Sequence, residues 1–126
     1  MPRILIVDDH DVVRQGVRHI LETQNHWEVA GEAANGEEAL RLYQQIKPDA
    51  VVMDITMPVM NGLDATSEIV KRNPDSKVLI LTMHEASSFL QSIRRSGARG
   101  VVAKSRAMDE LTPALQAIIA GQTYFN

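Results

Sequence analysis

Short apolar runs recur along the chain at roughly even spacing, and most of them are apolar at consecutive rather than alternate positions. They occupy residues 4–7, 27–30, 50–53, 78–81 and 101–103. Continuous runs of this length, rich in aliphatic residues, are typical of strands in a parallel sheet that is covered on both faces. The pattern therefore predicts five buried parallel strands.

The segments between these runs carry apolar residues with helical spacing. The predicted helix faces are Val13, Val17, Ile20 and Leu21; Ala39, Leu40 and Tyr43; a weaker stripe of Leu63, Ser67 and Val70; and a stronger one of Leu111, Leu115, Ile118 and Ile119. Pro48 and Pro74 end the second and third helices, because the residue before a proline disfavours the α conformation. Strands and helices that alternate in this way predict an α/β domain with a doubly wound five-stranded parallel sheet and five helices.

Composition narrows the classes of function. The 126 residues are enough for one domain with its own core, which we expect to span residues 1–121 with a tail or linker start at 122–126. The absence of cysteine excludes disulfides, thiolate metal sites and thiol nucleophiles. The net charge of −3 does not favour nucleic-acid binding by this domain. Because no stretch is apolar enough for a signal peptide or a bilayer span, we expect a cytoplasmic protein without membrane association.

Polar residues follow four of the five apolar runs at the point where each predicted strand ends. They are Asp8 and Asp9 after the first run, Asp54 after the third, Thr82 after the fourth and Lys104 after the fifth. Each has an ordinary explanation alone, such as a turn, a helix cap or a solvated charge. Ligands of such sheets bind beyond the carboxyl ends of the strands, so the coincidence at four strand ends indicates one site.

The residue types at this edge indicate phosphoryl chemistry. Three neighbouring carboxylates repel one another, and a hard divalent cation such as Mg²⁺ relieves that repulsion. With the cation bound, one carboxylate can attack phosphorus and form an acyl phosphate. The Lys104 ammonium and the Thr82 hydroxyl would then help to hold the phosphoryl oxygens.

Several segments resemble response regulator receiver domains. They are residues 4–10, which read Ile-Leu-Ile-Val-Asp-Asp-His; residues 54–63, which begin with Asp54 and end with Asn61-Gly62-Leu63; residues 81–84; and Lys104-Ser105. The resemblance covers essentially the whole chain and is greatest to the NarL/FixJ (LuxR-type) group. It implies the flavodoxin-like receiver fold, with strand order 2-1-3-4-5.

The resemblance also implies residue roles. Asp54 would accept the phosphoryl group from a sensor histidine kinase, and Thr82 and Lys104 would hold it. The implied Mg²⁺ ligands are Asp9, Asp54 and the backbone carbonyl of Thr56, with Asp8 acting through a bound water. We further hypothesise that Thr56 and His84, at the rim of the site, tune the access of the hydrolytic water.

The sequence is compatible with two ways in which the phosphorylated domain could pass on its signal. Receivers of the NarL/FixJ group usually precede a helix-turn-helix DNA-binding domain, which is absent from this chain, so phosphorylation would switch a transcription factor and could drive homodimer formation. The alternative is a stand-alone receiver that acts by protein contact without DNA. Many receivers carry an aromatic switch residue three positions before the lysine, whereas this chain has Val101, which has no ring to move.

Two other classes of protein fit less well. A haloacid-dehalogenase-type phosphatase needs a second acid two residues after its nucleophile, and Thr56 stands there. A nucleotide-binding domain needs a glycine-rich loop after the first strand, where this chain has four polar residues instead, at positions 8–11. We therefore expect a signalling switch rather than an enzyme with a separate substrate.

Overall fold

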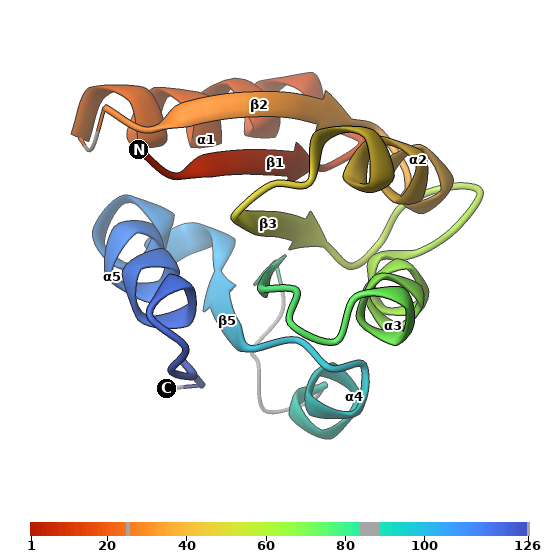
Figure 1. Ribbon diagram of the computed structural model, residues 1–126. Coiled ribbons are helices and arrows are strands. Elements are labelled where there is room, and N and C mark those ends of the chain that lie inside the picture. Colours follow the sequence, from red (N-terminus) through yellow and green to blue (C-terminus); the bar gives the residue numbers. More distant parts are fainter. Residues whose placement is uncertain (25, 84–88, 126) are drawn as a thin grey trace.

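Five parallel strands form one sheet in the order β2-β1-β3-β4-β5 (Figure 1). The computed structural model describes residues 1–24, 26–83 and 89–125. The strands are β1 (Arg3–Val7), β2 (Glu28–Ala33), β3 (Ala50–Asp54), β4 (Val78–Thr82) and β5 (Gly100–Ala103). In the described part of the chain the α-helices are α1 (Asp11–Gln24), α2 (Gly36–Ile46), α3 (Gly62–Arg72), α4 (Leu90–Arg95) and α5 (Ala107–Ile119), with a short 3-10 helix, η2 (Lys104–Arg106), before α5. The predicted fold class and strand order are both confirmed.

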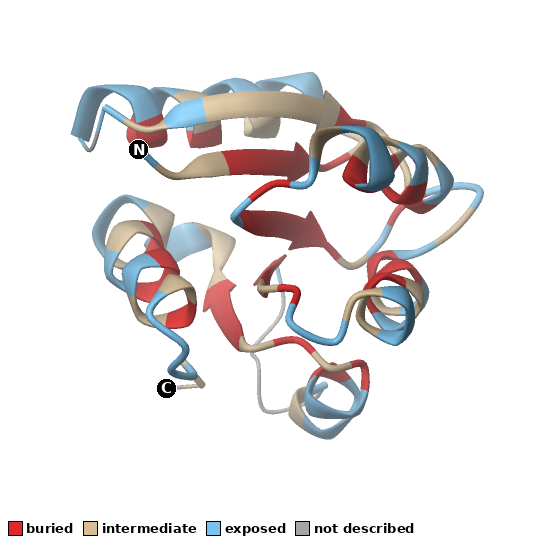
Figure 2. Ribbon diagram, viewed as in Figure 1, coloured by how far each residue is buried: buried red, intermediate tan, exposed pale blue. Residues whose placement is uncertain are grey.

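The sheet separates two apolar clusters, because successive side chains of a strand point to opposite faces. On one face, Leu5, Val51 and Ile80 pack with residues of α2, α3 and α4. On the other, Ile6 and Leu81 pack with residues of α1 and α5. Figure 2 shows the buried residues gathered in β1 and β3 and on the helix faces that turn toward the sheet. The continuous apolar runs in the sequence follow from this burial on both sides.

Asparagine side chains begin two of the helices on the first face. Asn35 Oδ1 accepts a hydrogen bond of 2.9 Å from the Glu38 amide at the start of α2. Asn61 Oδ1 accepts one of 2.9 Å from the Asp64 amide at the start of α3. Each cap satisfies an amide that has no partner inside its helix. The cap of α3 is important for the site, because α3 directly follows the loop that leaves β3.

Two sequence predictions need correction at the level of local structure. The second strand continues to Ala33, beyond the predicted run at 27–30, although it contains Glu32. The weak stripe predicted for α3 is only partly right. Leu63 packs against the core and Val70 is half-buried, but Ser67 is exposed. The helix buries Ala65, Thr66 and Ile69 instead. A buried threonine is tolerated there because Thr66 Oγ1 donates a 2.7 Å hydrogen bond to the Gly62 carbonyl.

The C-terminal segment is packed against the sheet, which corrects the expectation of a loose tail after Gly121. The Tyr124 amide donates to the Arg99 carbonyl and the Tyr124 carbonyl accepts from the Val101 amide, both at 2.9 Å, so the segment adds a short parallel bridge to β5. The Arg94 guanidinium of α4 lies 4.2 Å from the centre of the Phe125 ring. Residues up to 125 are therefore structurally part of the domain.

None of the helices in the described residues is long and apolar enough to pass through a lipid bilayer.

Candidate functional site

Four strand ends bring the predicted polar residues together at the carboxyl edge of the sheet. Asp8 follows β1, Asp54 ends β3, Thr82 ends β4 and Lys104 follows β5. Asp8, Asp54 and Thr82 are between 1 and 5% exposed, although all three carry polar side chains. A cavity of about 340 Å³ opens over them, and the residues that line it include Asp9, Asp54, Thr56, Thr82 and Lys104. The sequence argument from strand ends thus located the pocket, while the chemical roles of its residues stay predictions.

Lys104 connects two of the carboxylates. Its Nζ atom lies 2.9 Å from Asp8 Oδ2 and 3.2 Å from Asp54 Oδ1, and its side chain is only 15% exposed. Burial alone would lower the pKa of the Lys104 ammonium, but hydrogen bonds and charge from Asp8 and Asp54 outweigh it and raise that pKa above its ordinary value. Lys104 is therefore held in its charged form between the two acids.

Asp54 lies in an environment that disfavours its charge. Burial raises the pKa of the Asp54 carboxyl, the negative charge of Asp8 raises it further, and Lys104 opposes both effects without cancelling them. One ammonium therefore does not fully compensate the carboxylates of this pocket. A further positive charge at the site would favour the ionised form of Asp54.

The donor set of the pocket fits a divalent cation. Asp8, Asp9, His10 and Asp54 can each offer one ligand atom, and these atoms lie within 4.8 Å of one another. Asp9 Oδ1 is buried and accepts no hydrogen bond from the described residues by strict geometry, although His10 Nδ1 lies 3.0 Å from it. Asp8 Oδ2 also lacks a hydrogen bond by strict geometry, but its 2.9 Å contact with the Lys104 ammonium is a close ion pair. Carboxylate oxygens left in this state are the ligands that Mg²⁺ and similar hard cations bind.

The loop after β3 depends on a glycine that the sequence analysis did not single out as functional. A Cβ atom on Gly62 would lie 1.7 Å from the Asp54 carbonyl oxygen, which is an impossible distance. The Gly62 amide donates a 2.7 Å hydrogen bond to the Ile55 carbonyl and so holds the loop closed. The Asn61-Gly62 pair thus combines a helix cap with a close approach of backbone to Asp54, which is a recognised reason for glycine.

Arg14 supports the acid pair, Asp8 and Asp9, from outside the pocket. The sequence analysis also missed this residue. Its guanidinium donates to the Asp8 carbonyl oxygen and to the Asp11 carboxylate. Its Nε atom lies 3.1 Å from Glu32 Oε1 on β2, and Glu32 also pairs with Arg18. Periodicity assigns Arg14 only to the polar side of α1, and no local pattern reveals that Glu32 is its partner.

The remaining predicted residues fall in different places. Thr56 is exposed and lines the cavity, as its predicted position at the rim requires. Val101 is 3% exposed and belongs to the apolar cluster beneath α2, α3 and α4, so it is a core residue in this conformation. His84 lies outside the described residues.

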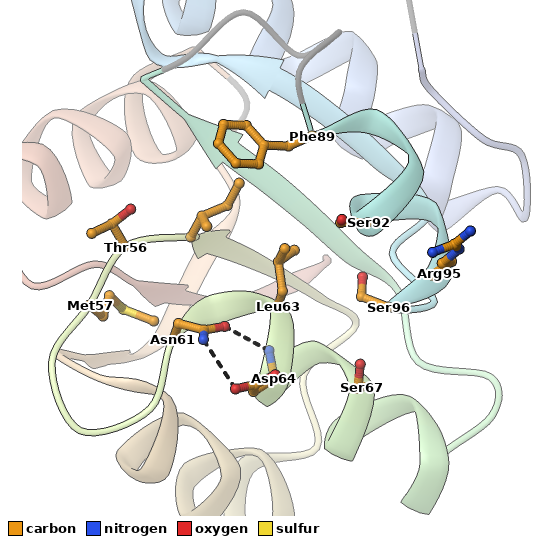
Figure 3. A pocket seen from close by; sticks show the side chains of 11 residues that line it. Thr56, Met57, Asn61, Leu63, Asp64, Ser67, Phe89, Ser92, Arg95 and Ser96 are labelled. Carbon is orange, nitrogen blue, oxygen red and sulfur yellow. Dashed lines mark hydrogen bonds between the residues drawn. The ribbon is translucent and has the colours of Figure 1, made fainter.

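A second and larger cavity, of about 560 Å³, lies beside the acidic pocket between α3 and α4 (Figure 3). It shares Ile55 and Thr56 with the acidic pocket but contains none of its buried acids. Its lining mixes apolar side chains such as Leu63 and Phe89 with Asp64 and Arg95. The cluster of acidic side chains therefore lies at the smaller pocket, although the larger one offers more space.

Comparison with known proteins gives one consistent family. The family model described as "Response regulator receiver domain" matches residues 4–116. "Response regulator GacA" of Pseudomonas aeruginosa is 37% identical over 126 residues, which are the whole of this chain and 59% of that protein. "Transcriptional regulatory protein DegU" of Brevibacillus brevis is 36% identical over 124 residues, which are 98% of this chain and 52% of that protein. The chain thus spans little more than half the length of these curated relatives.

Solved structures agree with the sequence relatives. The crystal structure of a "two-component response regulator, LuxR family" from Aurantimonas sp. SI85-9A1 superposes with a TM-score of 0.93 at 42% identity, and the match covers 98% of this chain and 89% of that one. The "response regulator domain of Thermotoga maritima CheB" gives a TM-score of 0.88 at 27% identity, over 95% and 97% of the two chains.

Proposed function

The chain belongs to the response regulator receiver domains of two-component systems, signalling modules rather than classical enzymes, and from this premise we propose that Asp54 is its phosphoacceptor. The observation that carries the proposal is the contact between Asp54 Oδ1 and Lys104 Nζ at 3.2 Å, inside the pocket that Asp9 and Thr82 also line. Asp8 Oδ2 lies 2.9 Å from the same ammonium. This arrangement provides a nucleophile together with positive and hydroxyl groups for a phosphoryl group. The phosphoryl donor is the phosphohistidine of a sensor histidine kinase.

The proposed transfer makes one bond and breaks one. A carboxylate oxygen of Asp54 attacks phosphorus, and the bond between phosphorus and the imidazole nitrogen of the donor breaks, with its electron pair remaining on the imidazole. Lys104, already charged between Asp8 and Asp54, turns toward the phosphoryl oxygens as negative charge gathers on them. The Thr82 hydroxyl, at the end of the neighbouring strand, holds another of these oxygens.

The acid pair, Asp54 and the Thr56 carbonyl would bind the metal ion of this reaction. We propose that Asp9 and Asp54 are direct ligands, that the backbone of Thr56 adds a third and that Asp8 acts through water. Mg²⁺ supplies charge that offsets the repulsion among three carboxylates and the incoming phosphoryl group. The support for this ligand set is that ligand atoms of Asp8, Asp9 and Asp54 lie within 4.8 Å of one another, and that the Asp9 Oδ1 atom is buried and, among the described residues, has only the nearby His10 ring nitrogen beside it.

We also propose the output of the switch. The receiver predicted at residues 1–121 is extended by the segment that packs on β5 as far as residue 125, and it would precede a C-terminal helix-turn-helix domain through which DNA would be bound. The support is that this chain covers 52 to 59% of relatives that are named response or transcriptional regulators. Phosphorylation would then switch a transcription factor in the cytoplasm and favour its homodimer. A stand-alone receiver acting by protein contact is the alternative, and the gene sequence beyond Asn126 decides between them.

Phosphorylation of single variants tests the assignment of Asp54. The purified chain is treated with acetyl phosphate and Mg²⁺, and the intact mass is measured. We expect the mass of one phosphoryl group on the wild type and on Asp75→Asn, a control that changes an exposed aspartate, but none on Asp54→Asn. Labelling of Asp54→Asn at the wild-type rate would contradict the assignment.

Lys104 has a role that differs from that of the acceptor. We expect Lys104→Ala to bind Mg²⁺ and to be labelled more slowly, because the acids remain and the charge that holds the phosphoryl oxygens is lost. The phosphorylated variant should also fail to show the conformational response of the wild type, measured as the change in amide hydrogen exchange on phosphorylation. A normal response in Lys104→Ala refutes the proposed role.

A further inference from the structure

One histidine touches both members of the acid pair. His10 Nδ1 lies 3.1 Å from Asp8 Oδ1 and 3.0 Å from Asp9 Oδ1. The rest of the residue faces outward, since the side chain is 61% exposed. One ring nitrogen therefore lies between two carboxylates of the proposed metal site, on the side of the site that faces solvent.

The ring contact is separate from the local turn that also involves His10. The His10 amide donates a 2.9 Å hydrogen bond to Asp8 Oδ1, and any residue except proline could make that bond. The turn thus explains the backbone position of residue 10 but not why an imidazole nitrogen lies against Asp9. What the imidazole adds is a nitrogen at the place where cation ligands converge, within 4.8 Å of a ligand atom on each of the three acids.

The chemistry of this nitrogen has opposite consequences for two classes of cation. Mg²⁺ prefers oxygen ligands and keeps several waters, so the imidazole competes with Mg²⁺ for the two oxygen atoms that it contacts, Asp8 Oδ1 and Asp9 Oδ1. Late first-row cations such as Ni²⁺ and Zn²⁺ accept imidazole readily beside carboxylate. For these cations the same ring can stay and become a ligand.

We propose that His10 sets the metal preference of this site, as a competitor of Mg²⁺ for Asp8 and Asp9 and as a nitrogen ligand of a late first-row divalent cation. This inference rests on the proposed metal site of the receiver and adds a residue to it. The site would therefore accept two kinds of cation with different coordination, one through oxygen atoms alone and one through carboxylates and His10.

Calorimetric titration of the intact chain with Mg²⁺ and, separately, with Ni²⁺ tests the proposal. His10→Ala should bind Mg²⁺ about two- to ten-fold more tightly, which is the effect of removing roughly one net hydrogen bond that competes with the metal. The same variant should bind Ni²⁺ at least about ten-fold more weakly, because a nitrogen ligand is lost and the loss of even an outer partner of a ligand costs about that much. The matched control is His19→Ala, which removes an exposed histidine of α1 and should change neither affinity.

The predicted changes in Mg²⁺ affinity and in Ni²⁺ affinity have opposite signs, and this makes the result decisive. If both affinities fall together in His10→Ala, or if neither moves, His10 does not set metal preference. A second variant, His10→Leu, keeps a side chain of substantial size but carries neither a hydrogen-bond donor nor a metal ligand, and it should show the same two shifts, so poor folding of one variant does not hide the answer. Circular dichroism of each variant verifies that the fold is kept.

Failure of this inference and failure of the proposed function have different signatures. Phosphorylation of the wild type by acetyl phosphate with Mg²⁺, and its loss in Asp54→Asn, test the function alone. A wild type that is phosphorylated while the His10 variants keep wild-type affinities for both cations overturns only the metal preference. A wild type that is not phosphorylated overturns the proposed function, whatever the titrations give.

Discussion

At the scale of single residues, the pocket holds more negative charge than its one lysine compensates. The pKa of Asp54 is raised by burial and by Asp8, which means that the ionised carboxylate is less favourable in the folded chain than in the unfolded one. Because the pKa of Asp54 is higher in the folded chain than in the unfolded chain, the folded chain binds more protons between these two pKa values. The stability of the fold therefore falls as the pH rises through this range. At neutral pH the ionised Asp54 therefore destabilises the metal-free domain.

This imbalance predicts that Asp54→Asn is more thermostable than the wild type without metal, by a few degrees near neutral pH. The amide keeps the shape and removes the charge that Asp8 repels. Thermal melting at a series of pH values measures the difference in melting temperature between Asp54→Asn and the wild type. This difference should become smaller toward acidic pH as the wild-type carboxyl takes up its proton. Excess Mg²⁺ should narrow it at neutral pH by stabilising the wild type through binding. A less stable variant without metal contradicts the charge argument.

Gly62 and Gly16 form a matched pair for testing how the loop positions Asp54. Gly62→Ala should destabilise the domain by about 1–3 kcal/mol and slow its phosphorylation, since the new Cβ must displace the Asp54 carbonyl. Gly16→Ala in α1 meets nothing within 4 Å and should stabilise by about 0.5–1 kcal/mol. Urea denaturation gives both values, and equal effects at the two glycines would show that close approach is not the reason for Gly62.

At the scale of elements, periodic apolar patterns in the sequence predicted the strands, whereas contacts between residues distant in the sequence were missed. The buried strands were identified because aliphatic residues at consecutive positions reflect burial on both faces. The extent of β2 was missed because the apolar run stops at residue 30, two residues before Glu32. The ion pairs of Glu32 with Arg14 and Arg18 explain how a charged residue is accommodated in the strand. The face of α3 was only partly predicted because it buries Ala65 and Thr66, which are small or polar residues that periodicity does not weight.

In the site, too, local sequence patterns predicted some residues, whereas contacts between side chains were not predictable. The acid pair and Asp54 were predictable, because each directly follows an apolar run and the fold class places strand ends together. The contact of His10 with both acids and the support of Asp8 by Arg14 depend on side-chain directions that spacing does not specify. Strand ends therefore predict which residues meet, and the structure is needed to show which atoms do.

The packed C-terminal segment predicts a measurable contribution to stability. Phe125→Ala removes the ring under Arg94 and part of the apolar contact with the core, so the free energy of unfolding should fall by about 1 kcal/mol. Gln122→Ala changes an exposed side chain three residues earlier and should have an effect within about 0.5 kcal/mol. Urea denaturation compares the two. If the two variants match, the segment after Gly121 does not contribute to the domain in solution.

At the scale of the whole molecule, the proposed phosphorylation of Asp54 must act on a distant surface to serve as a signal. Phosphorylation biases an equilibrium between conformations, so some element must differ between them. Val101 is buried in the core with no ring to move, which makes it a packing residue. Thr82 lies at the end of β4, and its proposed contact with the phosphoryl group gives β4 a direct link to the site.

This division of roles predicts different behaviour for two variants. Val101→Ala should lower the melting temperature, because a core truncation of this size costs about 1–3 kcal/mol. It should nevertheless keep the full change in amide hydrogen exchange when acetyl phosphate and Mg²⁺ are added, since the residue packs but does not relay. Thr82→Ala should accept the phosphoryl group and lose most of that change, because the contact that pulls β4 toward Asp54 is gone. A normal response in Thr82→Ala together with a lost response in Val101→Ala would reverse the assignment and make position 101 the relay despite its missing ring.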